Sequence, residues 1–117
     1  MGFSRAVRVG NMVSVAGTAP IAEGGGTACP GDAYGQMKRC IEISRTALQQ
    51  AGATLDDVVR TRILLTNIDD WQAAAKAHGE IFGSVRPVIT VMAVSGFVDP
   101  AWLVETEMDA IVEGRNS

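Results

Sequence analysis

One charged side chain of this sequence stands where it could bind a small molecule. Arg86 and Pro87 directly precede residues 88–94, an apolar run interrupted only by Thr90. A run this short and this rich in Val and Ile is typical of a buried strand. A guanidinium at the start of this strand is either a solvated surface group or a receptor for an anion. The second reading is chemically reasonable because the planar fork of N–H donors matches a carboxylate. Both readings stay open at this point.

Other residues with catalytic or metal-binding chemistry are few. His78 is the only histidine, so the sequence offers neither a His-rich metal site nor a Ser-His-Asp triad. It falls among apolar residues of an expected helix, which favours a packing role. Cys29 and Cys40 have no second metal-type ligand near them, and the glycines match neither a Walker loop nor a dinucleotide fingerprint. We therefore expect no metal and no cofactor.

Composition and charge exclude several classes of protein. The chain has 117 residues, and we expect a single domain over 1–117. The net charge of −3 and the few aromatic residues, 5% of the chain, argue against binding nucleic acid. No apolar run is long enough to cross a membrane. Two cysteines do not form a disulfide framework, so we expect a cytoplasmic protein with reduced thiols.

The order of expected elements is ββαβαββ. Gly10-Asn11 separates two short β-type runs and predicts a hairpin, and residues 17–31 are expected to form a loop. Asp32 is a plausible helix N-cap and Gly52 a plausible C′ residue. The predicted strands are 5–9, 12–16, 58–66, 88–94 and 102–112, and the predicted helices span about 32–52 and 69–82.

Apolar spacing indicates how these elements pack. Each helix has one apolar stripe: Tyr34, Met37, Cys40, Ile41, Ser44, Leu48 and Ala51 in the first, and Trp71, Ala74, Ala75, His78, Ile81 and Phe82 in the second. The simplest packing is an α+β fold, a mixed sheet with two helices on one face. The strand 88–94 is apolar on both faces, so a second copy of the chain is expected to cover the other side.

The last strand alternates between two kinds of side chain. Trp102, Val104, Thr106, Met108 and Ala110 point one way, and Leu103, Glu105, Glu107, Asp109 and Ile111 point the other. Three carboxylates on the face away from the helices cannot form a core. That face must border water or a polar interface, where Arg60 and Arg62 could pair with them.

Four segments together resemble the Rid (YjgF) family of imine/enamine deaminases. They are GNMVSVAGTAP, AGATLDDVVRTRILLTNIDDW, VRPVITV and LVETEMDAIV, and the resemblance runs from about Phe3 to Val112. Each motif alone is weakly specific, but four in the same order are strong. The resemblance implies a chorismate-mutase-like fold. It also implies a homotrimer whose sheets form a central barrel, with ligand clefts between subunits.

The resemblance also implies an activity, the hydrolysis of 2-imino or enamine acids to 2-oxo acids and ammonia. Arg86 corresponds to the arginine that grips the substrate carboxylate. Glu105 corresponds to the glutamate that positions water or handles protons, although a register two residues later would select Glu107. Gly17 corresponds to a glycine whose backbone contacts the ligand, and Thr18 and Phe3 complete the expected substrate-binding set.

Several positions depart from the family pattern. Phe3 stands in place of a tyrosine and Thr18 in place of a glutamine, while Ala75 and Val88 replace the usual asparagine and cysteine. Two other functions are therefore considered: a non-catalytic trimer that binds a small carboxylate metabolite, and a ribonuclease. The acidic pI of about 5.0 and the single histidine argue against the ribonuclease.

Overall fold

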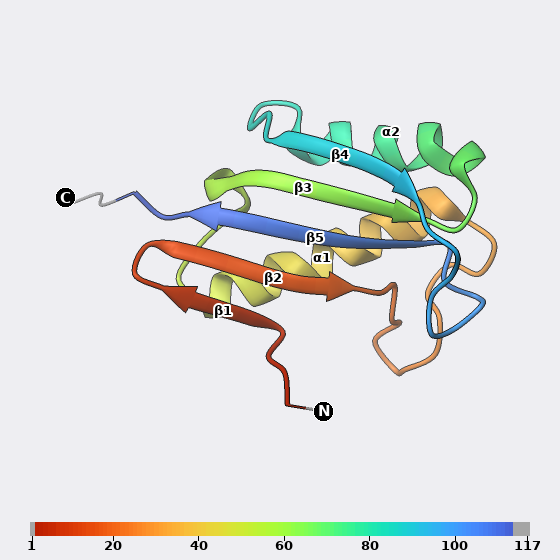
Figure 1. Cartoon of the computed structure of the whole chain (residues 1–117), viewed down its shortest axis with the longest axis horizontal. Helices are drawn as coiled ribbons and strands as arrows, with labels where there is room; N and C mark the ends of the chain where they lie inside the picture. The colour runs from red at the N-terminus through yellow and green to blue at the C-terminus, as the bar shows by residue number, and fades with distance from the viewer. Residues whose placement is uncertain (1, 114–117) are drawn as a thin grey trace.

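The computed structural model describes residues 2–113 and confirms the predicted α+β class. The strands and helices follow one another in the predicted order ββαβαββ, with two short 3-10 turns between them (Figure 1). Their bounds are β1 Ala6–Val9, β2 Met12–Thr18, α1 Ala33–Gln50, η1 Leu55–Asp57, β3 Val58–Leu65, η2 Ile68–Asp70, α2 Trp71–Phe82, β4 Val88–Ala93 and β5 Val104–Ile111.

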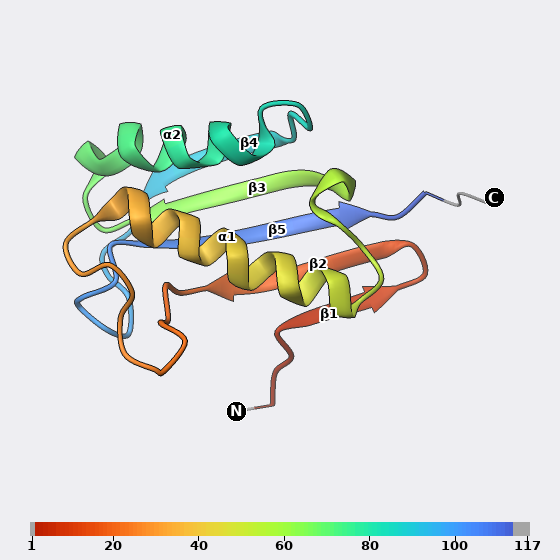
Figure 2. The same cartoon turned by 180° about the vertical axis from the view of Figure 1, so that it is seen from behind.

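The strands form one mixed sheet in the order β1-β2-β5-β3-β4. β4 lies parallel to β3, and the other three pairs are antiparallel. Figures 1 and 2 show that both helices cover the same face of the sheet and leave the opposite face open. The predicted arrangement of two helices on one face is confirmed.

Local sequence signals determine where these elements begin and end. Gly10 has a φ of +59° in the hairpin between β1 and β2, a conformation that glycine adopts without steric cost. Asp32 caps α1, and its side chain accepts a hydrogen bond of 3.1 Å from the Gly35 amide. Gly52, with a φ of +83°, lies just beyond the C-cap of the same helix.

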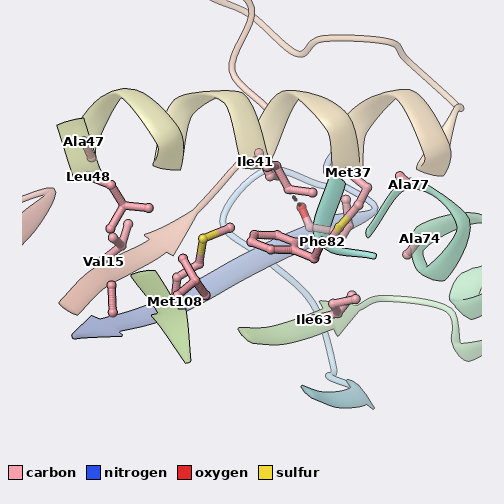
Figure 3. Packing of buried hydrophobic residues seen from close by; sticks show 14 of the residues in the cluster. Val15, Met37, Ile41, Ala47, Leu48, Ile63, Ala74, Ala77, Phe82 and Met108 are labelled. Carbon is pink, nitrogen blue, oxygen red and sulfur yellow. Dashed lines mark hydrogen bonds between the residues drawn. The ribbon is translucent and has the colours of Figure 1, made fainter. Parts of the chain in front are cut away.

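The core lies between the two helices and the covered face of the sheet. Figure 3 shows Ile41 and Leu48 of α1, Phe82 of α2 and Met108 of β5 packed together in it, and all four are buried. His78 is buried as predicted, and its Nε2 lies 2.9 Å from the Thr61 hydroxyl. Burial lowers the pKa of His78, which favours the neutral ring and agrees with a packing role in α2.

The second helix departs from the predicted stripe at two positions. Trp71 begins α2 directly after the 3-10 turn and is 48% exposed, so its assignment to the core was wrong. Ala77 is buried in the stripe instead. Trp71 is the first residue of α2, and residue spacing alone does not reveal that the described chain covers the start of this helix only partly.

Two strand boundaries also differ from the expectation. β2 continues through Thr18, so Gly17 belongs to a strand and not to the predicted loop. β5 begins at Val104, because the Trp102 amide bonds the Asp99 carbonyl in a turn. The extension of β2 matters for function, because it places Gly17 beside β5.

The prediction that the strand 88–94 is buried on both faces is wrong for the single chain. β4 is an edge strand that pairs with β3 alone among the described strands. Val88, Ile89 and Met92 are 57%, 44% and 42% exposed. The apolar run reflects surface that the described chain leaves open, because α2 covers this edge only partly.

Candidate functional site

A pocket of about 540 Å³ lies where β2 ends and β5 begins. This volume falls within the usual range of small-molecule sites. Four of the five residues proposed for the site lie in its lining: Phe3, Gly17, Thr18 and Glu105. The N-terminal segment, β2, α1 and the loops on either side of them supply its walls, so residues distant in sequence meet there.

A β-bulge brings Gly17 to Glu105. Val15 pairs with Met108 and Thr18 with Thr106, so β2 has one residue more than β5 between these two pairs. The bulge brings the Gly17 backbone close to the Glu105 side chain. A Cβ built on Gly17 would lie 3.1 Å from Glu105 Oε1, a distance that only a glycine leaves free of crowding.

Arg5 is a site residue that the sequence analysis missed. It lines the same pocket, and its Nη1 donates to the Gly17 carbonyl at 2.8 Å and to the Thr18 hydroxyl at 2.9 Å. Its guanidinium also lies over the Phe3 ring, 5.9 Å from the ring centroid. The only sequence signal was the place of Arg5 at the start of the predicted strand 5–9, which was expected to pair with the strand 12–16 directly before Gly17.

Three effects act on the pKa of the Glu105 carboxyl, and they do not all have the same sign. Burial raises its pKa, and the nearby Glu107 charge raises it further, while the Arg5 guanidinium lowers it. Burial is the largest of these effects. Glu105 is thus a more basic carboxylate than one in water, and Arg5 opposes its protonation.

Glu107, the alternative to Glu105, faces a different environment. Its Oε1 lies 3.5 Å from Arg62 Nη1, and Asp109 lies 3.6 Å from the same nitrogen. Ser14 donates a further hydrogen bond of 3.0 Å to Asp109. Glu107 is therefore part of an ion-pair cluster at the middle of the open sheet face, whereas Glu105 lines the pocket.

Apolar side chains flank this ion-pair cluster on the open face. Strand register places Val7, Val9, Met12 and Ile111 on one side of it and Val88 and Met92 on the other. All six are at least 42% exposed. A monomer rarely exposes so much apolar surface around a polar centre, and such a pattern is typical of an interface.

Arg86 does not reach the pocket within its own chain. It precedes β4, which begins at Val88. Val88 pairs with Arg60 of β3, and Arg60 pairs in turn with Asp109 of β5. Glu105 stands level with Met92, four residues further along β4, and four residues of strand span about 13 Å. Figure 1 shows β4 beginning at the opposite end of the sheet from the start of β5.

The backbone at Arg86 is unusual. Arg86 has a φ of +59°, and its amide bonds the Phe82 carbonyl at 2.9 Å beyond the end of α2. A left-handed conformation costs a non-glycine residue about 1–2 kcal/mol. The side chain is exposed and projects from a strained corner of the fold.

The described residues contain neither a candidate metal cluster nor a helix that could span a membrane. Within residues 2–113, His, Cys, Asp and Glu side chains form no group of three or more that could hold a metal ion. No helix in that same range is both long and apolar enough to pass through a bilayer.

The chain belongs to the YjgF/RutC family. The family model described as "Endoribonuclease L-PSP" matches residues 1–112, which confirms the resemblance to the Rid (YjgF) family. An uncharacterized protein of Streptomyces coelicolor is 40% identical over 93% of this chain and 81% of its own length. The 3-aminoacrylate deaminase RutC of Acinetobacter baylyi is 32% identical over 86% of this chain and 79% of its own length.

A solved structure agrees with this assignment. A Mycobacterium tuberculosis member of the YjgF/YER057c/UK114 family is 42% identical and superposes with a TM-score of 0.85. The match covers 95% of this chain and 87% of that one. The fold and the family are therefore established together.

Proposed function

We propose that this protein hydrolyses 2-imino acids to 2-oxo acids and ammonia, as a homotrimer with its sites between subunits. The observation that carries the proposal is the half-buried Glu105 carboxylate held against the Gly17 backbone at the polar end of an apolar pocket. Membership of a family that includes a protein named as a 3-aminoacrylate deaminase supports the reaction class.

The chemistry requires one base that becomes an acid. Glu105 accepts a proton from a water as the water oxygen attacks the imine carbon, which forms the C–O bond of a carbinolamine. The protonated carboxyl returns that proton to the imine nitrogen as the C=N π bond breaks, which completes the carbinolamine. Glu105 then takes the proton of the new hydroxyl and delivers it to the nitrogen, so that the C=O bond forms, the C–N bond breaks, and ammonia leaves a 2-oxo acid. A carboxylate with a raised pKa suits both steps, because it is a better base than an ordinary glutamate.

Arg5 and Gly17 organise this end of the pocket. The Arg5 bonds to the Gly17 carbonyl and the Thr18 hydroxyl hold the bulge in one conformation. The Arg5 charge also favours the ionised form of Glu105, which is the form that can accept the first proton.

The substrate carboxylate needs a cation, and we assign this role to Arg86 of a neighbouring subunit. Arg86 and Glu105 lie at opposite ends of their own sheet, so one chain cannot place both around a small molecule. The open sheet face, with its exposed apolar residues on both sides of a charged centre, supports association with further copies. A heterologous interface that closes into a ring would repeat the Arg86–Glu105 pairing at each contact.

Complementation between two variants tests the shared site. Arg86→Ala and Glu105→Gln should each abolish hydrolysis of an imine generated in situ by an amino-acid oxidase. After co-refolding in equal amounts, about one quarter of the sites should combine an intact Arg86 with an intact Glu105 from the neighbour. Return of about a quarter of wild-type activity supports the shared site, and a mixture as inactive as its components contradicts it.

The non-catalytic carboxylate binder is the second candidate, and Phe3 favours it. Phe3 lines the pocket without the hydroxyl that the family pattern usually supplies there. This candidate predicts that the wild-type protein binds 2-oxo acids but does not accelerate loss of the imine. Light scattering on the same sample should give three times the mass of the chain, and a monomer would contradict both candidates as trimers.

A further inference from the structure

We propose that the pocket selects acids whose side chain is bulky and apolar, branched or aromatic, over those with a methyl group. The inference rests on the proposed function for the 2-imino and 2-oxo acid headgroup. The choice of side chain comes from the pocket walls, which separate an ionic end from an apolar end.

The ionic end is compact. Arg5, Gly17, Thr18 and Glu105 are linked there by the two Arg5 hydrogen bonds and by the close approach of Gly17 to Glu105. A headgroup with one carboxylate and one imine or oxo carbon would occupy this end together with the attacking water. Elsewhere in the pocket lining the side chains are apolar except for the indole N–H of Trp102, which is itself buried.

The rest of the wall is apolar and comes from four separate segments. Phe3 lies in the N-terminal segment, Ile21 follows β2, Ile43 belongs to α1, and Val98 and Trp102 lie in the loop before β5. Figure 2 shows α1 lying across the face of the sheet that β2 and β5 form. Ile43 of this helix lines the pocket together with the loop residues. Apart from the buried Trp102 N–H, such a wall offers no side-chain hydrogen bond to a ligand, and it favours a ligand side chain that removes apolar surface from water.

The size of the pocket points the same way. Small-molecule sites bury most of their ligand, and a pocket of about 540 Å³ is far larger than an acid with a methyl side chain needs. Such a ligand would leave water against Ile43 and Trp102. A branched or aromatic side chain displaces this water, and each added buried methylene is expected to strengthen binding several-fold.

The side chains of Phe3 and Val98 are free to contact a ligand because the core does not use them. Phe3 is 63% exposed and Val98 is 94% exposed, so neither is used to pack the core. The Arg5 guanidinium lies over the Phe3 ring and favours a fixed place for it at the pocket wall. Apolar groups held at a pocket wall but left in water gain most from an apolar ligand.

Calorimetric titration of the full chain with three 2-oxo acids tests the inference without requiring turnover. We expect 4-methyl-2-oxopentanoate and phenylpyruvate to bind at least about tenfold more tightly than pyruvate. Equal affinities, tighter binding of pyruvate, or no binding of any of the three would overturn it. Imine hydrolysis measured in parallel separates the two proposals, because loss of turnover with the binding order intact contradicts only the deaminase assignment.

A matched pair of variants locates the effect. Ile43→Gln places a polar group on the apolar wall at similar length, and should weaken binding of 4-methyl-2-oxopentanoate about tenfold while leaving pyruvate unchanged. Ile81→Gln is the control, because Ile81 is also a half-buried helical isoleucine but lies outside this pocket. Thermal melts confirm that both variants fold. An equal effect of the two substitutions, or no effect of Ile43→Gln, would contradict the inference.

Discussion

The Glu105 carboxylate lies so close to the Gly17 backbone that a single added methyl group would touch it. A Cβ on Gly17 would come within 3.1 Å of Oε1 of Glu105. This is the tight point of the pocket, and it depends on the β-bulge that shifts the pairing of β2 with β5 between Val15 and Thr18. Arg5 acts on both residues of this contact. It donates a hydrogen bond to the Gly17 carbonyl, and its charge lowers the pKa of Glu105.

Replacing Gly17 should damage the site and spare the fold. Gly17→Ala adds a methyl group in an ordinary backbone conformation, so the strain falls on the Glu105 carboxylate, the mobile end of a side chain. We expect imine hydrolysis to fall at least about tenfold with a change in unfolding free energy of about 0.5 kcal/mol or less. Gly24→Ala is the control, since nothing lies near its Cβ position. Equal kinetic loss in both variants would show that the Gly17 contact is irrelevant.

Replacing Glu105 should abolish imine hydrolysis and slightly raise stability at neutral pH. Because burial raises the Glu105 pKa above its ordinary value of 4.5, the folded chain binds this proton more tightly than the unfolded chain does. The associated stability is fully present below pH 4.5 and is lost as the pH rises through the folded pKa.

Glu105→Gln has no carboxyl to ionise, so it does not lose this stability as the pH rises. The variant should therefore unfold at a slightly higher temperature than wild type at pH 7. Its gain in unfolding free energy should be less than about 1 kcal/mol, because the half-buried carboxylate is partly screened. The difference should shrink toward pH 4, and imine hydrolysis should be lost. Glu107→Gln should do the opposite, keeping activity while losing the contact with Arg62. Loss of activity in Glu107→Gln with an active Glu105→Gln would reverse our assignment of the two residues.

Removing Arg5 should shift the pH dependence of turnover. Because the Arg5 charge lowers the Glu105 pKa, Arg5→Gln should raise that pKa and move the acid limb of kcat/KM to higher pH. Arg8→Gln is a matched control three residues further along the chain, because Arg8 bonds the Gly10 and Ala51 carbonyls outside this pocket. A merely structural role for Arg5 predicts lower activity with an unmoved limb, and that result would contradict the electrostatic one.

The backbone at Arg86 gives a test that separates strain from ligand binding. Arg86→Ala and Arg86→Gly both remove the guanidinium, but only glycine accepts a φ of +59° without steric cost. The glycine variant should be about 1 kcal/mol more stable than the alanine variant, and both should lose carboxylate affinity by tenfold or more. Denaturant unfolding and 2-oxo acid titration give the two quantities. Wild-type affinity in either variant would exclude Arg86 as the clamp.

The two thiols should differ sharply in reactivity. Cys29 is exposed, whereas Cys40 is buried on the inner face of α1 with its Sγ 3.8 Å from the Val104 carbonyl. Burial also raises the pKa of the Cys40 thiol and suppresses the reactive thiolate. One equivalent of a disulfide reagent should react rapidly with the native protein and two with the unfolded protein. Rapid reaction of both in native protein, or resistance of Cys29 in a Cys40→Ala variant, would contradict this assignment.

The spacing of apolar residues and the helix caps predicted most of the fold. The alternation along residues 104–110 placed Val104, Thr106, Met108 and Ala110 on the buried face, and all four are buried. Asp32 and Gly52 marked the ends of α1 because caps are local signals that act over a few residues. Trp71 was misplaced because spacing assigns it to the face of Ala74 and His78 but does not reveal that the described chain leaves the first residue of α2 48% exposed.

The sequence by itself determined the family, the order of the elements and the residues Phe3, Gly17, Thr18 and Glu105 as candidates for one site. The tertiary structure decided which side chains meet. It placed Arg5 on the Gly17 carbonyl, separated Glu105 from the ion pairs of Glu107, and put Arg86 at the far end of the sheet. The physical reason is that periodicity assigns a residue to a face of its own element, whereas strand order, register and a bulge determine its neighbours across the sheet.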